Sequence, residues 1–263
     1  MTANHRPRKR FGQNFLKDQN VIAATIAAAE LSDTDHVLEI GPGRGALTDR
    51  MLPVVEHLDI IEIDRDLAAH LQERQTPNMT VHVGDALRLN WEKMLSAPPY
   101  KLVANLPYNI SSQILFKMID HRHLFERMVL MFQKEVGDRL RAEPSSKEYG
   151  SLTVLCQLWF DVSRVVLVPP TAFYPQPKVM SEVLCLKRRA QPRAEVTDPA
   201  FFGRVVKAAF AQRRKTLRNC LITAGFTAEQ LEQVTADTGL DFGRRGETLG
   251  IDEFAQLARV LAN

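Results

Sequence analysis

The stretch Val37–Thr48 constrains the fold of this chain more than any other. Residues 37–40 form a β-favouring run, and three glycines follow within five positions, at 41, 43 and 45. An amphipathic segment comes directly after them, so the predicted order is strand, tight turn and helix. Glycine lets a ligand lie against bare backbone, and the open amides at a helix start favour a polar or anionic group. The stretch therefore indicates a site for a nucleotide-like ligand.

The spacing of these glycines distinguishes two kinds of nucleotide site. The dinucleotide fingerprint needs its third glycine three residues after the second, whereas Gly45 follows Gly43 by two residues. A plain NAD site is therefore disfavoured. The pattern that starts at Glu39, acidic-x-Gly-x-Gly-x-Gly, resembles motif I of the S-adenosylmethionine-dependent methyltransferases. An ordinary glycine-rich turn between strand and helix is the alternative.

Carboxylates lie at the ends of the next two predicted strands. The strand Leu58–Ile63 contains Glu62, 21 residues after Gly41, where a carboxylate can accept hydrogen bonds from both hydroxyls of a ribose. This spacing supports a nucleoside without naming it, since NAD carries the same ribose. The strand Met79–Val83 precedes Asp85, which either accepts a hydrogen bond from the amino group of an adenine or is a simple turn aspartate.

A fourth predicted strand ends in Asn105-Leu106-Pro107-Tyr108. This run matches (Asn/Asp)-x-Pro-(Tyr/Phe), the motif of methyltransferases that alkylate the amino group of a planar amide or a nucleobase. The amino lone pair of adenine is delocalised into the ring, so the group is a poor nucleophile. The Asn105 side-chain oxygen and the Leu106 carbonyl can bind its two hydrogens, while Pro107 stiffens the turn and Tyr108 stacks on the base. A turn that merely ends a strand is the alternative.

A proline-rich connection presents an aromatic residue near the last predicted strands. Pro169–Val179 has four prolines within nine positions, on both sides of Phe173. An aromatic side chain on such a stiff connection loses little conformational entropy on binding. We therefore predict that Phe173 stacks on the target base, with burial of Phe173 as the alternative.

Strands and helices alternate up to residue 187, and only helices follow. Further strands are predicted over 128–132, 162–168 and 183–187, and helices over 21–31 with Asp18 as N-cap, 46–52, 65–74, 111–120 and from Gln133 onward. Residues 151–160 fit a helix or a strand. The order predicts an α/β fold, a Rossmann-like sheet with helices on both faces, over 1–187 with an N-terminal arm over 1–17. A small all-helical domain is predicted over 188–263, with helices near 228–236 and 251–261.

Positive charge is concentrated in two segments. Residues 1–20 carry a net +4 and residues 187–220 a net +8, which leaves −9 elsewhere in a chain of net charge +3. Two basic segments beside an acidic body indicate a polyanionic partner, nucleic acid before membrane, with solvated surface charge as the alternative. The candidate RNA contacts are Arg8, Lys9 and Arg10 in the arm and, on a predicted helix over 200–221, Arg204, Lys207, Arg213, Arg214, Lys215 and Arg218.

Six motifs occur in the order typical of one family. They are Phe-Gly-Gln-Asn-Phe-Leu, Glu-Ile-Gly-Pro-Gly-Arg-Gly, Glu-Ile-Asp, Asn-Leu-Pro-Tyr, Gln-Lys-Glu-Val and Phe-Tyr-Pro-x-Pro-Lys-Val, over residues 11–179. Together they resemble the KsgA family, the bacterial adenine dimethyltransferases of small-subunit ribosomal RNA. The resemblance implies that residues 11–16 close over the cofactor and that 151–160 is helical. It places the S-adenosylmethionine contacts on Asn14, Leu16, Gly41, Gly43, Glu62, Asp85, Ala86 and Asn105.

The same resemblance implies an activity. It is dimethylation of the 6-amino groups of two adjacent adenosines near the 3′ end of 16S ribosomal RNA, in a partly assembled 30S subunit. The base-handling residues fall on 105–108 and Phe173, and the C-terminal domain helps hold the RNA. Three alternatives remain: a macrolide-resistance methyltransferase that acts on large-subunit RNA, a protein-glutamine methyltransferase, and a non-enzymatic assembly factor.

Other features limit the remaining possibilities. Cys156, Cys185 and Cys220 lie far apart without paired metal-ligand spacing, and their odd number argues against a disulfide framework. His121 and His123 are the only close histidine pair, and surface positions suffice to explain them, so we predict no metal site. No run approaches the ~18 apolar residues of a membrane span, and the basic N-terminus lacks the apolar segment of a secretory signal. We expect a cytoplasmic monomer with no membrane contact.

Overall fold

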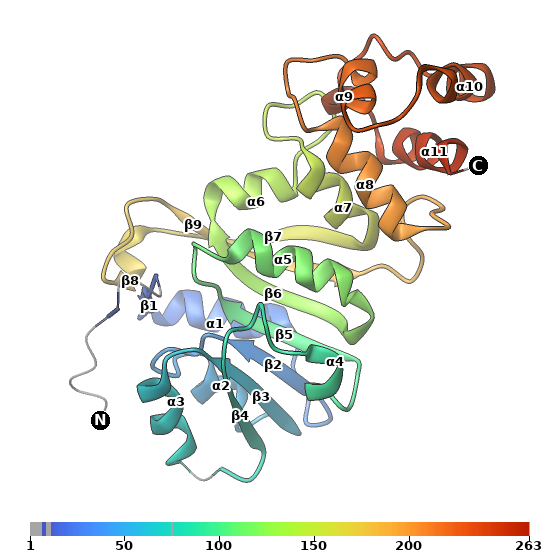
Figure 1. The fold of residues 1–263 in the computed structure, drawn as a ribbon. Helices are drawn as coiled ribbons and strands as arrows, with labels where there is room; N and C mark the ends of the chain where they lie inside the picture. Colours follow the sequence, from blue (N-terminus) through green and yellow to red (C-terminus); the bar gives the residue numbers. More distant parts are fainter. Residues whose placement is uncertain (1–6, 9–11, 75, 263) are drawn as a thin grey trace. The chain divides into compact units, whose positions relative to one another are not determined.

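The computed structural model describes residues 7–8, 12–74 and 76–262 (Figure 1). These residues divide into two compact units. The first comprises the described residues up to Gly137 together with Asp161–Arg188, and the second comprises Asp138–Phe160 together with the residues from Arg189 onward. The chain therefore enters the second unit at two places. The predicted break after residue 187 lies next to the second of them, whereas the first was not predicted.

A seven-stranded sheet is the framework of the first unit, with strand order β4-β3-β2-β5-β6-β9-β7. β2 pairs in parallel with β3 and β5, β3 with β4, and β5 with β6, whereas β9 is antiparallel to β6. The strands are His36–Ile40 (β2), His57–Glu62 (β3), Met79–Val83 (β4), Tyr100–Asn105 (β5), Phe125–Gln133 (β6), Phe160–Val168 (β7) and Ser181–Arg188 (β9). The predicted α/β sheet is confirmed.

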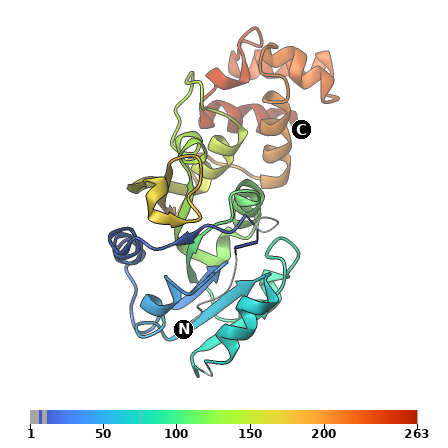
Figure 2. The ribbon, with the colours of Figure 1, turned by 90° about the vertical axis from the view of Figure 1, so that its left-hand side faces the viewer.

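Helices cover both faces of this sheet, as a largely parallel sheet with apolar strands requires. They are α1 (Gln19–Ala29), α2 (Thr48–Met51), α3 (Arg65–Gln72), α4 (Trp91–Met94) and α5 (Ser111–Asp120), whereas α6 (Lys134–Leu140) follows β6 and continues into the second unit. On one face, Ile22 of α1, Met51 of α2 and Leu71 of α3 form one apolar core with Leu58 and Val103 of the strands. α5 lies on the face opposite α1 (Figures 1 and 2).

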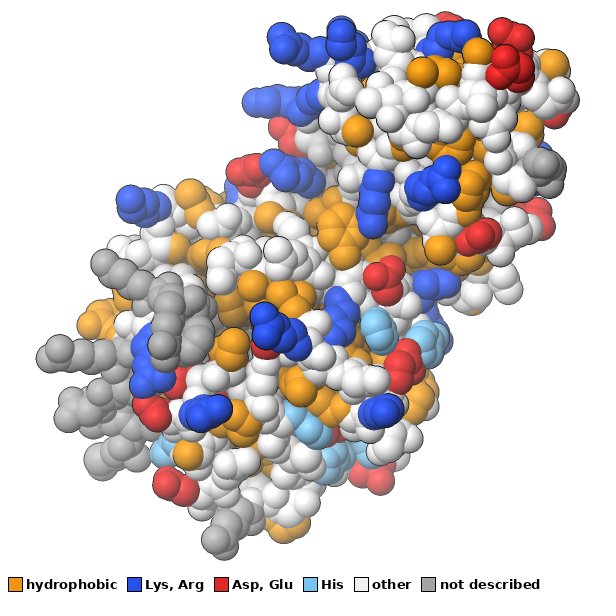
Figure 3. Space-filling model, in the orientation of Figure 1, with side chains coloured by type: hydrophobic (Ala, Val, Ile, Leu, Met, Phe, Trp, Pro, Cys, Tyr) orange, Lys and Arg blue, Asp and Glu red, His pale blue; other side chains and the backbone are white. Residues whose placement is uncertain are grey.

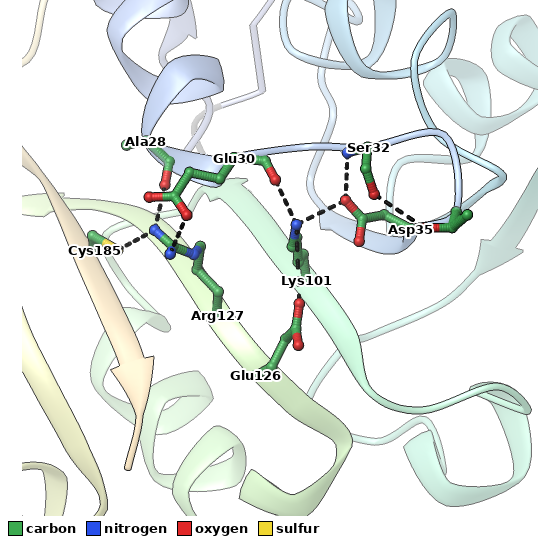
Figure 4. Close-up of polar contacts among 9 residues, drawn as sticks. Ala28, Glu30, Ser32, Asp35, Lys101, Glu126, Arg127 and Cys185 are labelled. Carbon is green, nitrogen blue, oxygen red and sulfur yellow. Dashed lines mark hydrogen bonds and ion pairs between the residues drawn. The ribbon is translucent and has the colours of Figure 1, made fainter. Parts of the chain in front are cut away.

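Helix α1 is held at both ends. Asp18 accepts hydrogen bonds from two backbone amides of the first turn, as predicted for an N-cap. At the other end, Lys101 Nζ donates to the Glu30 carbonyl at 2.5 Å and Arg127 donates to the Ala28 carbonyl at 3.1 Å (Figure 4). The last carbonyls of a helix lack partners within it, so these two cations satisfy them and offset the negative end of the helix dipole. These bonds fix the end of α1 to β5, which carries Lys101, and to β6, which carries Arg127.

A second, two-stranded sheet involves the segment directly before α1. β1 (Phe15–Leu16) pairs antiparallel with β8 (Phe173–Tyr174). The Lys17 amide continues the pairing with a hydrogen bond to the Ala172 carbonyl at 2.9 Å. Strands of two residues show no periodicity, which is why this pairing was not predicted.

The second unit is helical. Its helices are α7 (Ser151–Trp159), α8 (Pro199–Ala209), α9 (Leu217–Thr223), α10 (Ala228–Thr238) and α11 (Ile251–Leu261). Phe202, Leu231 and Phe254 are buried in its core. The Tyr149 hydroxyl donates to the Leu249 carbonyl at 2.9 Å, one of the contacts by which residues 138–160 belong with the C-terminal helices. The helical form of 151–160, which the resemblance implied, is confirmed.

No helix among residues 7–8, 12–74 and 76–262 combines the length and the apolar character needed to cross a bilayer. In the same ranges, no three His, Cys, Asp or Glu side chains are grouped as a metal site would require. The three cysteines are free thiols, and burial raises the pKa of Cys156 to about 12.

Candidate functional site

A pocket lies at the carboxyl ends of strands β2 to β5. Its walls are the glycine-rich turn after β2, the residues that end or follow β3, β4 and β5, and the segment 12–16. Open α/β sheets bind their ligands at this edge. The run 105–108 lines the pocket, and so does every predicted cofactor contact, namely Asn14, Leu16, Gly41, Gly43, Glu62, Asp85, Ala86 and Asn105.

The three glycines of the turn have backbone conformations that side chains disfavour. Their φ angles are +68° at Gly41, +60° at Gly43 and +86° at Gly45, all in the left-handed region. A Cβ atom on Gly43 would lie 2.9 Å from the Phe15 ring. Glycine is therefore needed here for its conformation and, at Gly43, for the close approach of segment 12–16 to the turn.

Glu39, the acidic residue of the turn motif, also lines the pocket. Its side chain is buried, and it accepts a hydrogen bond from Thr48 Oγ1 at 2.6 Å. Burial raises the pKa of Glu39 to about 8, with the nearby charges of Asp49 and Glu62 acting in the same direction. The carboxyl group is therefore mostly protonated at neutral pH, and it connects β2 to the start of α2.

The two predicted carboxylates lie in the same pocket. Glu62, at the end of β3, is only 4% exposed and accepts a hydrogen bond from the Asp64 amide at 2.8 Å. Burial raises the pKa of Glu62, while backbone amides of Asp64 and Gly43 act in the opposite direction. Asp85, after β4, is more open, and its Oδ1 accepts a hydrogen bond from the Leu87 amide at 2.9 Å.

Asn105, at the end of β5, has a defined side-chain orientation. Its Nδ2 donates to the Asn14 backbone carbonyl at 3.1 Å. A carbonyl can only accept, so the amide nitrogen must face Asn14. The Asn105 Oδ1 atom therefore points away from the Asn14 carbonyl, and it is the atom able to accept a hydrogen bond from a substrate.

The ring of Tyr108 is anchored through its hydroxyl. The Tyr108 hydroxyl and Ser181 Oγ lie 2.7 Å apart, and Ser181 is fully buried at the start of β9. Burial raises the pKa of the Tyr108 hydroxyl, which stays neutral. This hydrogen bond holds the Tyr108 ring at the pocket wall, where the predicted stacking needs it.

Segment 12–16 is held over the pocket by a carboxylate that the sequence analysis did not single out. Asp64 is fully buried and accepts hydrogen bonds from Gln13 Nε2 at 3.1 Å and from Arg8 at 2.7 Å. Arg8 also contacts Asp66. Two carboxylates therefore bind the Arg8 guanidinium in this structure, and a contact of Arg8 with RNA stays a prediction. Lys9 and Arg10 lie outside the described residues.

The sequence matches the family model for the ribosomal RNA adenine dimethylases over residues 4–263. The chain belongs to this family. It is 63% identical to a protein named ribosomal RNA small subunit methyltransferase A from Syntrophotalea carbinolica, over 98% of each chain. A protein of the same name from Geobacter sulfurreducens is 48% identical, over 97% of this chain and 95% of that one.

Two solved structures resemble the fold. A dimethyladenosine transferase from Plasmodium falciparum has a TM-score of 0.77 and 30% identity, over 92% of this chain and 95% of that one. The 23S rRNA methyltransferase ErmE has a TM-score of 0.68 and 27% identity, over 95% of this chain and the whole of that one. The predicted methyltransferase fold and the predicted resemblance to this family are confirmed.

Phe173 does not have the position predicted for it. Its side chain is 0% exposed and belongs to the apolar core, whereas the neighbouring Tyr174 is 58% exposed. Successive side chains of a strand point to opposite faces, and the pairing of β8 with β1 directs Phe173 inward. The prediction of Phe173 as an open stacking face is therefore wrong for this structure.

The predicted basic helix over 200–221 is also wrong, because residues 210–216 separate α8 from α9. Arg213, in this connection, forms an ion pair with Glu247 and contacts the Lys147 carbonyl. Arg204, on α8, lies over the rings of Phe201 and Phe226. Figure 3 shows Lys and Arg side chains on the second unit where α8 and α9 lie. The exposed cations of this segment include Lys207, Arg214, Lys215 and Arg218.

Proposed function

We propose that this chain dimethylates the 6-amino groups of two adjacent adenosines near the 3′ end of 16S ribosomal RNA, with S-adenosylmethionine as methyl donor. Family membership supports the reaction, and the names of the 63% and 48% identical relatives support the small subunit. A large-subunit substrate has weaker support, since ErmE is 27% identical. The family match disfavours a protein-glutamine substrate.

The pocket residues fit the donor. Glu62 suits the two ribose hydroxyls, because a nearly buried carboxylate gains from charge-assisted hydrogen bonds. Asp85 suits the adenine amino group, and the bare backbone of Gly41 and Gly43 leaves room for the rest of the molecule. When bound, the donor supplies an electrophilic methyl group on a sulfonium.

The orientation of Asn105 is the observation that carries the proposal. Its Nδ2 is occupied by the Asn14 carbonyl, so Oδ1 accepts one hydrogen of the target amino group, and the Leu106 carbonyl accepts the other. Two acceptors in these positions direct the amino lone pair away from the base plane. Tyr108, held by Ser181, stacks on the base. No strong base is required, because the proton leaves to water after transfer, and catalysis is mostly positioning.

The RNA is proposed to bind through phosphate contacts of the exposed cations near α9, chiefly Arg214, Lys215 and Arg218. In this proposal the protein acts as a cytoplasmic monomer on a partly assembled 30S subunit, and no metal takes part. The net +8 of residues 187–220 supports a polyanionic partner.

Single-turnover methylation by Asn105→Ala tests the proposal. Undermethylated small subunits and saturating donor are used, and mono- and dimethyladenosine are counted by mass spectrometry. We expect roughly 10²-fold slower transfer, because a misplaced group in a positioning-dominated site has an effect of this size. Binding of the subunit should largely survive, since Tyr108 stacking contributes ~1–3 kcal/mol. Asn20→Ala, at an exposed position on α1, is the matched control.

Donor affinity is measured in parallel, because Asn105 also lines the donor pocket. Wild-type rates of both methylation steps in Asn105→Ala would show that this residue is only a turn residue. Methylation by the wild type of large-subunit RNA alone would replace the proposed substrate. If the wild type bound the subunit without methylating it, the function of a non-enzymatic assembly factor would replace the proposed one.

A further inference from the structure

The loop after β4 wraps around a lysine from another part of the chain. Residues 84–90 connect β4 to α4 and carry Asp85 and Ala86 into the pocket. Lys117, on α5, donates from Nζ to three carbonyls of this loop: Ala86 at 3.0 Å, Leu87 at 3.1 Å and Leu89 at 2.6 Å. An ammonium has three donors, so these three bonds use all of them. Lys117 is therefore occupied entirely in shaping the loop.

The surroundings of Lys117 strengthen these hydrogen bonds. Its Nζ lies 4.8 Å from the centre of the Trp91 ring, which is buried. Partial burial lowers the pKa of Lys117, while the charge of Asp85 acts in the opposite direction. Hydrogen bonds from a cation are stronger than neutral ones, and more so where water is partly excluded.

A single peptide group connects Lys117 to Asp85. The C=O and N–H of a trans peptide point in opposite directions. In the peptide between residues 86 and 87, the oxygen accepts from Lys117 Nζ, while the N–H, that of Leu87, donates to Asp85 Oδ1 at 2.9 Å. By fixing the oxygen, Lys117 fixes the N–H that orients the Asp85 carboxylate.

We propose that Lys117 is a positioning residue for recognition of the donor's adenine. Through the 86–87 peptide it aims the Asp85 carboxylate, whose second oxygen then accepts a hydrogen bond from the adenine amino group. The inference rests on the proposed function, which assigns the donor to this pocket. A carboxylate aimed in this way favours a 6-amino base over a 6-oxo base, because the oxo oxygen has no proton to donate and repels the carboxylate.

Calorimetry with two ligands tests this role. S-Adenosylhomocysteine carries the 6-amino base. S-Inosylhomocysteine carries a 6-oxo base, which also has a proton on N1, and the rest of the molecule is the same. The variants are Lys117→Met, which keeps an unbranched apolar stem without the ammonium group, and Asp85→Ala. Lys93→Met is the matched control, since Lys93 is an exposed lysine on the neighbouring helix α4. Circular dichroism establishes that each variant is folded.

The wild type and Lys93→Met should prefer the 6-amino ligand. Lys117→Met should lose tenfold or more in affinity for that ligand and little for the 6-oxo ligand, so that its preference falls to that of Asp85→Ala. In the double variant Lys117→Met, Asp85→Ala, the losses of affinity for the 6-amino ligand should not add. An unchanged preference in Lys117→Met would overturn the inference. If both affinities fell by the same factor, Lys117 would only support the pocket, and if neither fell, Lys117 would have no role in donor binding.

Lys117→Gln provides a second variant with a smaller change, and the same loss of preference is expected in it. If Lys117→Met does not fold, an unchanged preference in Lys117→Gln is sufficient to overturn the inference. Failure of the donor assignment in the proposed function has a different signature, because the wild type itself would then bind neither ligand. A different RNA substrate would leave these affinities as they are.

Discussion

Replacement of Glu39 by Gln should make the protein more resistant to alkaline conditions. The pKa of Glu39 is raised from 4.5 to about 8, mainly by burial. At pH values between 4.5 and about 8, Glu39 retains a proton in the folded chain and releases it in the unfolded chain. The free energy of unfolding therefore falls as the pH rises through this window, by up to ~1.4 kcal/mol per pH unit. Below pH 4.5 both states are protonated, and the effect is absent.

A glutamine does not titrate, and its side-chain oxygen can still accept the hydrogen bond that Thr48 Oγ1 makes at 2.6 Å. The stability difference between variant and wild type should thus grow with pH, by roughly 2–3 kcal/mol from pH 5 to pH 7, and level off above pH 8. Urea unfolding of the ligand-free proteins at pH 5, 6, 7, 8 and 9 measures this difference in the free energy of unfolding. Glu232→Gln, at an exposed position on α10, is the control. A difference that is the same at pH 5 and pH 8 would refute the burial of a protonated Glu39.

Three further changes test the donor pocket and the RNA contacts. Glu62→Ala should lower the calorimetric affinity for S-adenosylmethionine tenfold or more, because it removes two charge-assisted hydrogen bonds of ~1.5–3 kcal/mol each; unchanged affinity would contradict the ribose assignment. Gly43→Ala should weaken donor binding, and this variant should unfold more easily than Gly239→Ala. Both glycines have a left-handed backbone, with φ of +60° and +70°, but only a Cβ at Gly43 would lie 2.9 Å from a ring, that of Phe15. Equal losses of stability in the two variants would show that the contact with Phe15 is irrelevant. Replacing both Arg214 and Lys215 by Ala should lower the slope of subunit affinity against salt by about two on a log–log plot and leave donor affinity unchanged, and an unaltered slope would remove this segment from the RNA contacts.

Local patterns were sufficient where one short stretch sets the structure. The predicted bounds of β4, α5 and α11 agree with those observed, and Asp18 caps α1 as expected. Such features depend on periodicity and on hydrogen bonds between residues a few positions apart. The pocket belongs to the same class, because the carboxyl ends of parallel strands meet at one edge of the sheet. Residues at this edge, such as Glu62 of β3 and Asn105 of β5 on the two sides of β2, therefore had to lie near one another.

Features that depend on distant partners were not predictable in this way. The burial of Phe173 rather than Tyr174 follows from the pairing of β8 with β1, two-residue strands more than a hundred positions apart. The assignment of residues 138–160 to the helical unit depends on contacts such as that of Tyr149 with Leu249.

The sequence by itself determined the order of the elements, the need for glycine in the turn after β2, and the set of polar groups at the strand ends. These follow from backbone sterics and from the short-range patterning of apolar residues. Only the tertiary structure decided which cations stay available and which groups hold the pocket in shape. Arg8 binds Asp64 and Arg213 binds Glu247, while Lys117 shapes the loop of Asp85. A charged side chain is long enough to reach many partners, so the partner it finds is set by which elements pack beside it.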